Sequence, residues 1–417
     1  MVQLHIANTV TDLIQGDVQE HLPLERIPLG GDVLGLGTTS GWDNGELTFL
    51  CDDPALAGPG PGDRQAAEAG GPGAGSASAD GAPSSSGSPR HQELATRLYK
   101  SQPHDGSLLR LEPGAGLQHF PYVCFSDDAS ALRRPVPRAL LAEAAGRPLQ
   151  QLIAEAIAAM RADGSLEPSP IVGLRLLSRW ESLVITVASK LCLGQLRRNE
   201  GLARLQRLGG EGESVGASIY DRLPHFRLSA EDPGDPADPI RWLGASRHWE
   251  CCGFFDAQPE SGRVTVPQAG AHLHLHGCST DLRHGGHLHH EHPGSRLAEL
   301  QWLVLYPLAA ITTLASDLAV AGLGWQAGEL TFTVHNQGSL DASDIGVALV
   351  INDRWSDHRY LHLPWLAAGA AERVSMSLEL PPGPHHLEVI VDPERRILEE
   401  EARRANNRAA LRLTIAP

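Results

Sequence analysis

Three histidines in the second half of the chain have the spacing of ligands to one metal ion. Residues 272–276 read His-Leu-His-Leu-His, and His287 follows two glycines. Side chains two residues apart lie on one face of a β-strand, so His274 and His276 can share an ion. The intervening residues 277–286 are enough for a turn and a return strand that brings His287 beside them. Three imidazoles leave a coordination position open, which is typical of catalytic rather than structural zinc sites.

The other histidines of this stretch have no ligand spacing. We expect His289, His290 and His292 to be exposed, and we keep His272 as a weaker candidate for an additional ligand. A histidine-rich tract can also buffer metal ions at a surface without catalysis, and this interpretation stays open.

The elements that position these residues are mostly short strands. Strand-like runs occur at residues 47–50, 95–99, 107–111, 122–125 and 183–187. One amphipathic helix is indicated over residues 147–161, because Leu149, Leu152, Ile153, Ile157 and Met160 recur at spacings of three and four. Pro148 near its start and Gly164 just past its end agree with this assignment. The apolar run 302–314 is too short to span a bilayer, and we expect it to be a buried strand.

The pattern of residues indicates two domains. Residues 55–89 are dominated by Gly, Pro, Ala and Ser, which predicts a disordered insertion (about residues 55–92) within the first domain. From about residue 316, short alternating runs at 330–334, 347–351, 374–378 and 386–391 predict an immunoglobulin-like all-β sandwich, with a helix only at 397–404. We therefore expect an α+β, β-rich domain with mixed sheets at residues 1–312 and an all-β sandwich at 316–417.

Composition limits the partners of the chain. Its 417 residues carry a net charge of −16, which argues against nucleic acid or an anionic membrane and favours a small metabolite or a metal. The N-terminal residues have no signal-peptide pattern, and the six cysteines show neither CxxC spacing nor a disulfide framework. We expect a cytoplasmic protein with reduced thiols. The oligomeric state is open, with a homodimer among the alternatives.

The metal motif resembles that of the α-acetolactate decarboxylases. The run from His274 through Asp281 and Arg283 to Gly285-Gly286-His287 has the family's pattern of His-Leu-His, a short acidic and basic turn, and Gly-Gly-His. Upstream, residues 34–38 and 42–47 resemble the family's Gly-Leu-Gly-Thr segment followed by Asp-Gly-Glu. Residues 105–107, 122–125 and 252–255 also fit, so the resemblance covers roughly residues 4–310.

The resemblance implies an activity and a set of site residues. The activity is decarboxylation of 2-acetolactate, a 2-hydroxy-3-oxo acid, to acetoin and carbon dioxide, without an organic cofactor. His274, His276 and His287 would bind Zn²⁺ or another divalent transition metal, which acts as a Lewis acid on the substrate oxygens. Glu46 corresponds to an active-site glutamate that moves the proton, and Arg198 is the candidate for the catalytic arginine that fixes the carboxylate. A solvated Arg197-Arg198 pair and a surface hairpin carboxylate at Glu46 are the alternatives.

The sequence departs from the family pattern at two points. The family's Thr-Arg-Thr context is missing around Arg198, and its C-terminal glutamate has no clear counterpart, with Glu291 and Glu299 as candidate replacements. Two alternatives therefore stay open: a non-catalytic metal-binding or adhesion protein on a decarboxylase-like scaffold, and a lyase for a different 2-hydroxy-3-oxo acid.

The C-terminal region resembles the CARDB modules of bacterial proteins. The matching segments are residues 333–338, 366–369, 391–393 and the stretch from Glu399-Glu400-Glu401 to Asn406-Asn407. This resemblance covers about residues 316–415 and implies a β-sandwich that binds a protein or a carbohydrate. It carries little information about activity.

Overall fold

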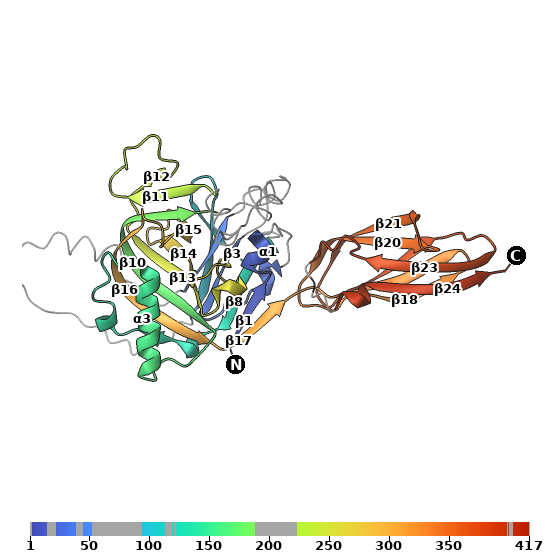
Figure 1. The fold of residues 1–417 in the computed structure, drawn as a ribbon, viewed down its shortest axis with the longest axis horizontal. Coiled ribbons are helices and arrows are strands. Elements are labelled where there is room, and N and C mark those ends of the chain that lie inside the picture. Colours follow the sequence, from blue (N-terminus) through green and yellow to red (C-terminus); the bar gives the residue numbers. More distant parts are fainter. Residues whose placement is uncertain are drawn as a thin grey trace, which may run out of the picture.

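The computed structural model describes residues 2–14, 22–38, 45–51, 94–112, 119–120, 122–187, 223–397, 399 and 403–416. Most of these residues belong to β-sheets, which form a larger N-terminal unit and a smaller C-terminal one (Figure 1). The expected insertion at residues 55–92 lies outside the described residues. No helix among the ranges above is long and apolar enough to cross a membrane.

The first sheet of the N-terminal unit has seven strands in the order β17-β1-β8-β3-β4-β5-β6. Their bounds are β1 Gln3–Ala7, β3 Val33–Thr38, β4 Glu46–Cys51, β5 Thr96–Ser101, β6 Leu108–Leu111, β8 Tyr122–Asp128 and β17 Ala310–Leu314. Strand β17 runs parallel to β1, whereas the other neighbours are antiparallel, so the sheet is mixed, as expected.

The second sheet has eight strands and is organised around the long strand β10. Its members are β9 Arg134–Pro135, β10 Ile171–Thr186, β11 His225–Ser229, β12 Arg241–Gly244, β13 His248–Asp256, β14 Leu273–Ser279, β15 Gly285–Leu288 and β16 Arg296–Leu308. The order is β12-β11-β10-β13-β14-β15, and β15 pairs again with the end of β10. The pairings among β10, β13, β14 and β15 therefore close into a ring, with the histidine-bearing hairpin as part of it.

Helices contribute little to this unit. The 14-residue helix α3 (Leu149–Ala162) is the only α-helix longer than five residues in the described part of the chain, since α1 covers only Val10–Ile14. It confirms the helix predicted over residues 147–161, and every apolar residue of the predicted face is buried. The remaining pieces are the small sheet of β2 (Leu22–Pro23) and β7 (His119–Phe120) and the 3-10 turns η1 Leu24–Arg26, η2 Ser130–Leu132, η3 Arg138–Leu140 and η4 Pro259–Ser261.

Two hydrophobic cores cover the two faces of the eight-stranded sheet. One core lies between the two sheets, where Leu36 and Phe49 pack with Cys252 and Phe254. The other holds α3 together with side chains such as Leu275 on the opposite face of the sheet. The leucines of β14 face α3, so the alternating histidines face the seven-stranded sheet.

The C-terminal unit is a β-sandwich of a three-stranded and a four-stranded sheet. The first contains β18 Leu318–Gln326, β19 Glu329–Asn336 and β22 Ala371–Ser377; the second contains β20 Ala342–Ile351, β21 Arg354–Leu366, β23 Gly383–Val391 and β24 Arg408–Ile415. The strands predicted at 330–334, 347–351, 374–378 and 386–391 are confirmed. The sandwich has its own core and continues from β17 at one end of the larger unit (Figure 1).

One expected element of the sandwich is wrong within the described residues. The described residues of the range 397–404 form no α-helix, and the 3-10 turn η5 (Arg404–Asn407) begins at its end, while residues 398 and 400–402 lie outside the described part. The Asp392 carboxylate accepts hydrogen bonds from the backbone N–H groups of Arg396 and Ile397. Such bonds from an aspartate to nearby N–H groups compete with helix formation, which apolar spacing does not reveal.

Candidate metal centre

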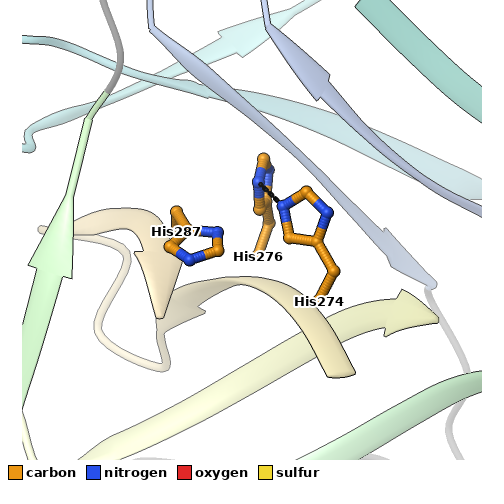
Figure 2. A group of neighbouring side chains, drawn as sticks. All are labelled: His274, His276 and His287. Carbon is orange, nitrogen blue, oxygen red and sulfur yellow. Dashed lines mark hydrogen bonds between the residues drawn. The ribbon is translucent and has the colours of Figure 1, made fainter. Parts of the chain in front are cut away.

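Strand pairing brings three histidines to one point between the two sheets. In the register of β13, β14 and β15, Cys252 lies opposite His276, and His276 lies opposite His287. His274 and His276 share a face of β14, and one ligand atom from each of the three histidines lies within 4.8 Å of the others (Figure 2). The predicted return strand is β15, which begins at Gly285 and therefore includes both glycines.

Backbone carbonyls fix the tautomers of two of these imidazoles. His274 Nδ1 donates to the Val264 carbonyl at 2.6 Å, and His276 Nδ1 donates to the Leu47 carbonyl at 2.7 Å. Because a carbonyl can only accept, each Nδ1 carries the hydrogen and each Nε2 keeps a lone pair. The two Nε2 atoms are 3.2 Å apart (Figure 2). Two lone pairs at this distance repel each other unless a cation or a proton lies between them.

Burial keeps the three imidazoles neutral. They are 4, 1 and 7% exposed. Burial lowers the pKa of His274 to about 4, against the opposing effect of its bond to Val264. Burial also holds the pKa of His276 and of His287 well below its usual range, and neighbouring histidines lower both further. At neutral pH all three are therefore in the form that binds metal.

The donor set fits a divalent transition metal. Neutral imidazoles suit zinc and its neighbours in the first transition row. The carbonyls of Val264 and Leu47 are the outer partners that orient metal-bound histidines in other proteins. Among the described residues, these three histidines are the one group of His, Cys, Asp or Glu side chains with this geometry.

The structure places Glu46 beside this centre. Glu46 is the first residue of β4, is 3% exposed, and has its Oε2 atom 3.7 Å from His276 Nε2. The next residue of the same strand, Leu47, provides the carbonyl that holds His276. The alternative of a surface hairpin carboxylate is therefore wrong, since the strand carries Glu46 into the space between the sheets.

The proposed arginine cannot be placed in the same way. Arg198 lies outside the described residues. In the register of β10 and β15, the residue opposite His287 is Thr186. No motif in the sequence indicated that Thr186 would lie beside the histidines, since only strand pairing brings it there.

Two of the histidines expected at the surface, His289 and His290, have buried side chains. His289 is 6% exposed, because the alternation of β15 continues past His287 and places both rings on one side, with centroids 4.8 Å apart. Its Nδ1 donates to the Glu291 carboxylate at 2.8 Å, and its Nε2 accepts from the Thr186 hydroxyl at 3.1 Å. The expectation that His289 is exposed is wrong, and the spacing of two from His287 was the sequence pattern that could have shown it.

The other candidates lie farther from the centre. The His290 side chain is only 8% exposed, so the expectation that His290 is exposed is wrong as well, because its Nε2 is bonded to the Leu273 carbonyl. His292 is half-buried. His272 Nδ1 donates to the Asp256 carbonyl, and the ring stacks on Phe255 rather than joining the three ligands. Of the two candidate replacements for the family's C-terminal glutamate, Glu291 binds His289, whereas Glu299 is half-exposed and pairs with Arg179.

A cavity of about 720 Å³ adjoins the centre. His274 and His287 form part of its wall, together with His272, His289 and Glu291, and with α3 residues such as Gln150. Neither His276 nor Glu46 lines it. The cavity therefore reaches the centre from the side of His274 and His287.

Comparison with known proteins identifies the C-terminal domain. Residues 324–410 match the family model of CARDB. The solution structure of the CARDB domain of a Pyrococcus furiosus protein has 19% identity, covers 25% of this chain and 97% of that chain, and gives a TM-score of 0.21. A crystal structure of the same archaeal domain in complex with di-metal ions has 19% identity, covers 24% and 88%, and gives a TM-score of 0.20. Residues 324–410 are a CARDB domain.

The comparisons do not assign the N-terminal unit to a family. None of the curated proteins matches the chain. Red sea bream transglutaminase has 11% identity, covers 60% of this chain and 28% of that chain, and has a TM-score of only 0.18.

Proposed function

We propose that this chain is a metal-dependent carboxy-lyase that converts 2-acetolactate to acetoin and carbon dioxide, with Zn²⁺ as the metal. The observation that carries the proposal is the position of Glu46, a buried carboxyl group 3.7 Å from a three-histidine centre. Glu46 and the three histidines, which the resemblance implied as parts of one active site, thus lie close together, although Glu46 and His274 are more than 200 residues apart in the sequence.

Each residue has a role in this reaction. His274, His276 and His287 would hold the metal. A divalent metal in this site would supply Lewis-acid stabilisation of the negative charge that develops on oxygen. When the bond to the carboxylate carbon breaks, its electron pair passes to the adjacent ketone group, and carbon dioxide leaves. Glu46 then gives a proton to the carbon that lost the carboxylate, and solvent restores the proton. One proton is consumed for each substrate anion.

The decisive experiment is turnover of 2-acetolactate by the zinc-loaded protein. We expect acetoin formation, and we expect Glu46→Gln to lower the rate by roughly 10²–10⁴-fold, the usual contribution of a positioned proton donor. Zinc content should be unchanged in that variant. Glu299→Gln, at the half-exposed partner of Arg179, is the matched control and should keep full activity. If no acetoin forms above background, the proposal is wrong.

A lyase for a longer homologue is a variant of this proposal that the same assay separates. The ethyl homologue of acetolactate has the same 2-hydroxy-3-oxo acid group and differs by one methylene. A higher kcat/KM for this homologue would assign the chain to the larger substrate.

A second candidate function is metal binding without catalysis. The observation that favours it is the number of additional histidines in the wall of the adjoining cavity. This candidate predicts stoichiometric zinc, no acetoin, and no effect of Glu46→Gln on any property except stability. A cytoplasmic location, a homodimeric state and a protein or carbohydrate partner of the CARDB domain stay predictions.

A further inference from the structure

The three histidines of the centre are buried in the described part of the chain, so a metal ion needs a route to them. These histidines are at most 7% exposed. The 720 Å³ cavity touches His274 and His287. Side chains with nitrogen or oxygen donors line this cavity: His225, His272, His289, His290, Glu291 and His292. None of them belongs to the three-histidine group.

These side chains form a series of short steps that leads away from the centre. The His287 and His289 ring centroids are 4.8 Å apart, and those of His289 and His225 are 4.9 Å apart. The centroid of His292 is 6.3 Å from that of His225. An ion held by one ring therefore needs to move only a few ångströms to reach the next.

Hydrogen bonds to the backbone prepare several of these rings to accept a cation. His272 Nδ1 and His225 Nδ1 donate to the carbonyls of Asp256 and Leu223, each at 2.8 Å, so both rings carry the hydrogen on Nδ1. His290 Nε2 donates to the Leu273 carbonyl at 3.2 Å, so its Nδ1 keeps the lone pair, and this atom is 3.7 Å from Glu291. This is the arrangement of outer partner and ligand seen at His274 and His276.

The carboxylate of Glu291 lies on the solvent side of the histidines that line the cavity. The Glu291 side chain is 58% exposed and also binds His289 at 2.8 Å. A partly exposed negative charge at a cavity wall raises the local concentration of cations, and the net charge of −16 acts in the same direction.

We propose that this cavity is the entry site through which a divalent transition-metal cation reaches the buried centre, with Glu291 and His292 as the outer capture residues. His290 adds a ligand atom beside Glu291, and His225 and His289 pass the ion inward, with the ion replacing the Thr186 hydroxyl as the partner of His289 Nε2. The proposal rests on the metal centre of the proposed function but not on decarboxylation, so it holds even if the centre does no chemistry.

The test is the rate at which the metal-free full-length protein takes up Co²⁺. Growth of the visible absorption of histidine-bound Co²⁺ is followed after rapid mixing, without substrate. We expect the double variant Glu291→Gln/His292→Gln to load roughly ten-fold more slowly, at the lower end of the effect that charge steering has on association rates. Its final absorption should equal that of the unchanged protein.

The CARDB domain offers a matched control. Asp353 and His386 form a surface pair at 2.9 Å, so Asp353→Asn/His386→Gln removes the same two kinds of group far from the cavity. It should load at the unchanged rate. If the double variant of the cavity does not fold, the single variant His292→Gln at a half-buried position takes its place, with a smaller slowing expected.

Two results would overturn the entry site. Loading of the cavity variant at the rate of the control would show that ions enter elsewhere. A loss of final absorption together with rate would show that these residues hold the centre itself. Failure of the centre is a separate result, because then the unchanged protein and His276→Ala would both show no Co²⁺ absorption.

Discussion

At the scale of single residues, backbone acceptors decide the chemistry of the site. The carbonyls of Val264 and Leu47 accept hydrogen bonds from Nδ1 of His274 and of His276, so the hydrogen of each ring is on Nδ1. The two Nε2 atoms, each with a lone pair, are then 3.2 Å apart. Two neutral imidazoles packed in this way cannot form a hydrogen bond with each other, because both facing nitrogens are acceptors. A bound cation removes the repulsion, which is the physical reason to regard the cluster as a metal centre rather than as part of the core.

Loss of one of these ligands should abolish stable metal binding. We expect His276→Ala to lower zinc affinity by more than about 100-fold, because even the loss of an outer partner costs roughly 10–100-fold. Zinc content after dialysis, measured by elemental analysis, checks this prediction. His335→Ala on β19 of the CARDB domain is the control and should retain the metal. Full zinc retention by His276→Ala would show that the three histidines are not the ligands.

The cysteines give a prediction that depends on pH. Burial raises the pKa of Cys51 and of Cys124 to about 12, and it raises that of Cys251, Cys252 and Cys278 as well. A raised thiol pKa lowers the thiolate fraction at any pH below it, and the thiolate is the reactive form. We therefore expect iodoacetamide at pH 8 to leave these five cysteines unmodified in the native protein and to modify them in urea, as peptide mass spectrometry can show. Rapid modification of any of them in the native state would contradict their burial.

At the scale of elements, the site depends on the approach of β4 to the β14–β15 hairpin. β14 and β15 carry the three histidines, and β4 supplies both Glu46 and the carbonyl of Leu47. A shift of β4 would thus separate the carboxyl group from the metal ligands without removing either.

Gly45 allows this shift to be tested. A Cβ atom at Gly45 would lie 1.5 Å from the Ser101 carbonyl oxygen on β5, so Gly45→Ala must displace the start of β4. We expect acetoin formation to fall by at least about ten-fold while zinc stays bound, since a misplacement of 1 Å can cost roughly 100-fold in rate. Gly30→Ala, where nothing lies within 4 Å of the added Cβ, should behave as the unchanged protein. Equal rates for both variants would show that Glu46 does not need its present position.

The elements differ in how well the sequence predicts them. The alternation in residues 272–276 predicts β14 and its histidine face, and the spacing of apolar residues predicts α3. Only residues 183–187 of β10 were predicted, although it runs from Ile171 to Thr186. Arg175, Ser178 and Arg179 interrupt its apolar pattern, and Arg175 is nevertheless fully buried because Asp32 pairs with it.

At the scale of the whole molecule, a buried polar network joins the two sheets of the N-terminal unit. Arg175 of β10 binds Asp32 at 2.6 Å and donates to the carbonyls of Val33 and Phe49. Tyr306 of β16 donates to the second oxygen of Asp32 at 2.7 Å. The network holds the seven-stranded sheet, with Glu46, in its position over the histidines.

Removal of one charge from this network should destabilise the unit strongly. We expect Asp32→Ala to lower the free energy of unfolding by about 3–5 kcal/mol, because it leaves the Arg175 guanidinium buried without its partner. Urea unfolding followed by near-UV circular dichroism measures this. Glu112→Ala, in the exposed pair with Arg110, should cost no more than about 1 kcal/mol. An equal effect of the two substitutions would show that the buried pair does not hold the sheets together.

The sequence by itself was enough to predict that the three histidines form one group, and to predict the helix α3, the strands of the sandwich and the CARDB character of residues 324–410. These features depend on spacing along a single strand or helix, or on local motifs, so a linear pattern contains them. The tertiary structure alone decided that Glu46 lies 3.7 Å from His276, that Thr186 lies opposite His287, and that a cavity with His289 in its wall adjoins the centre. Each of these depends on which strands pair and which sheets pack. Pairing between distant strands follows from burial and register across the whole unit, which no local pattern of residues specifies.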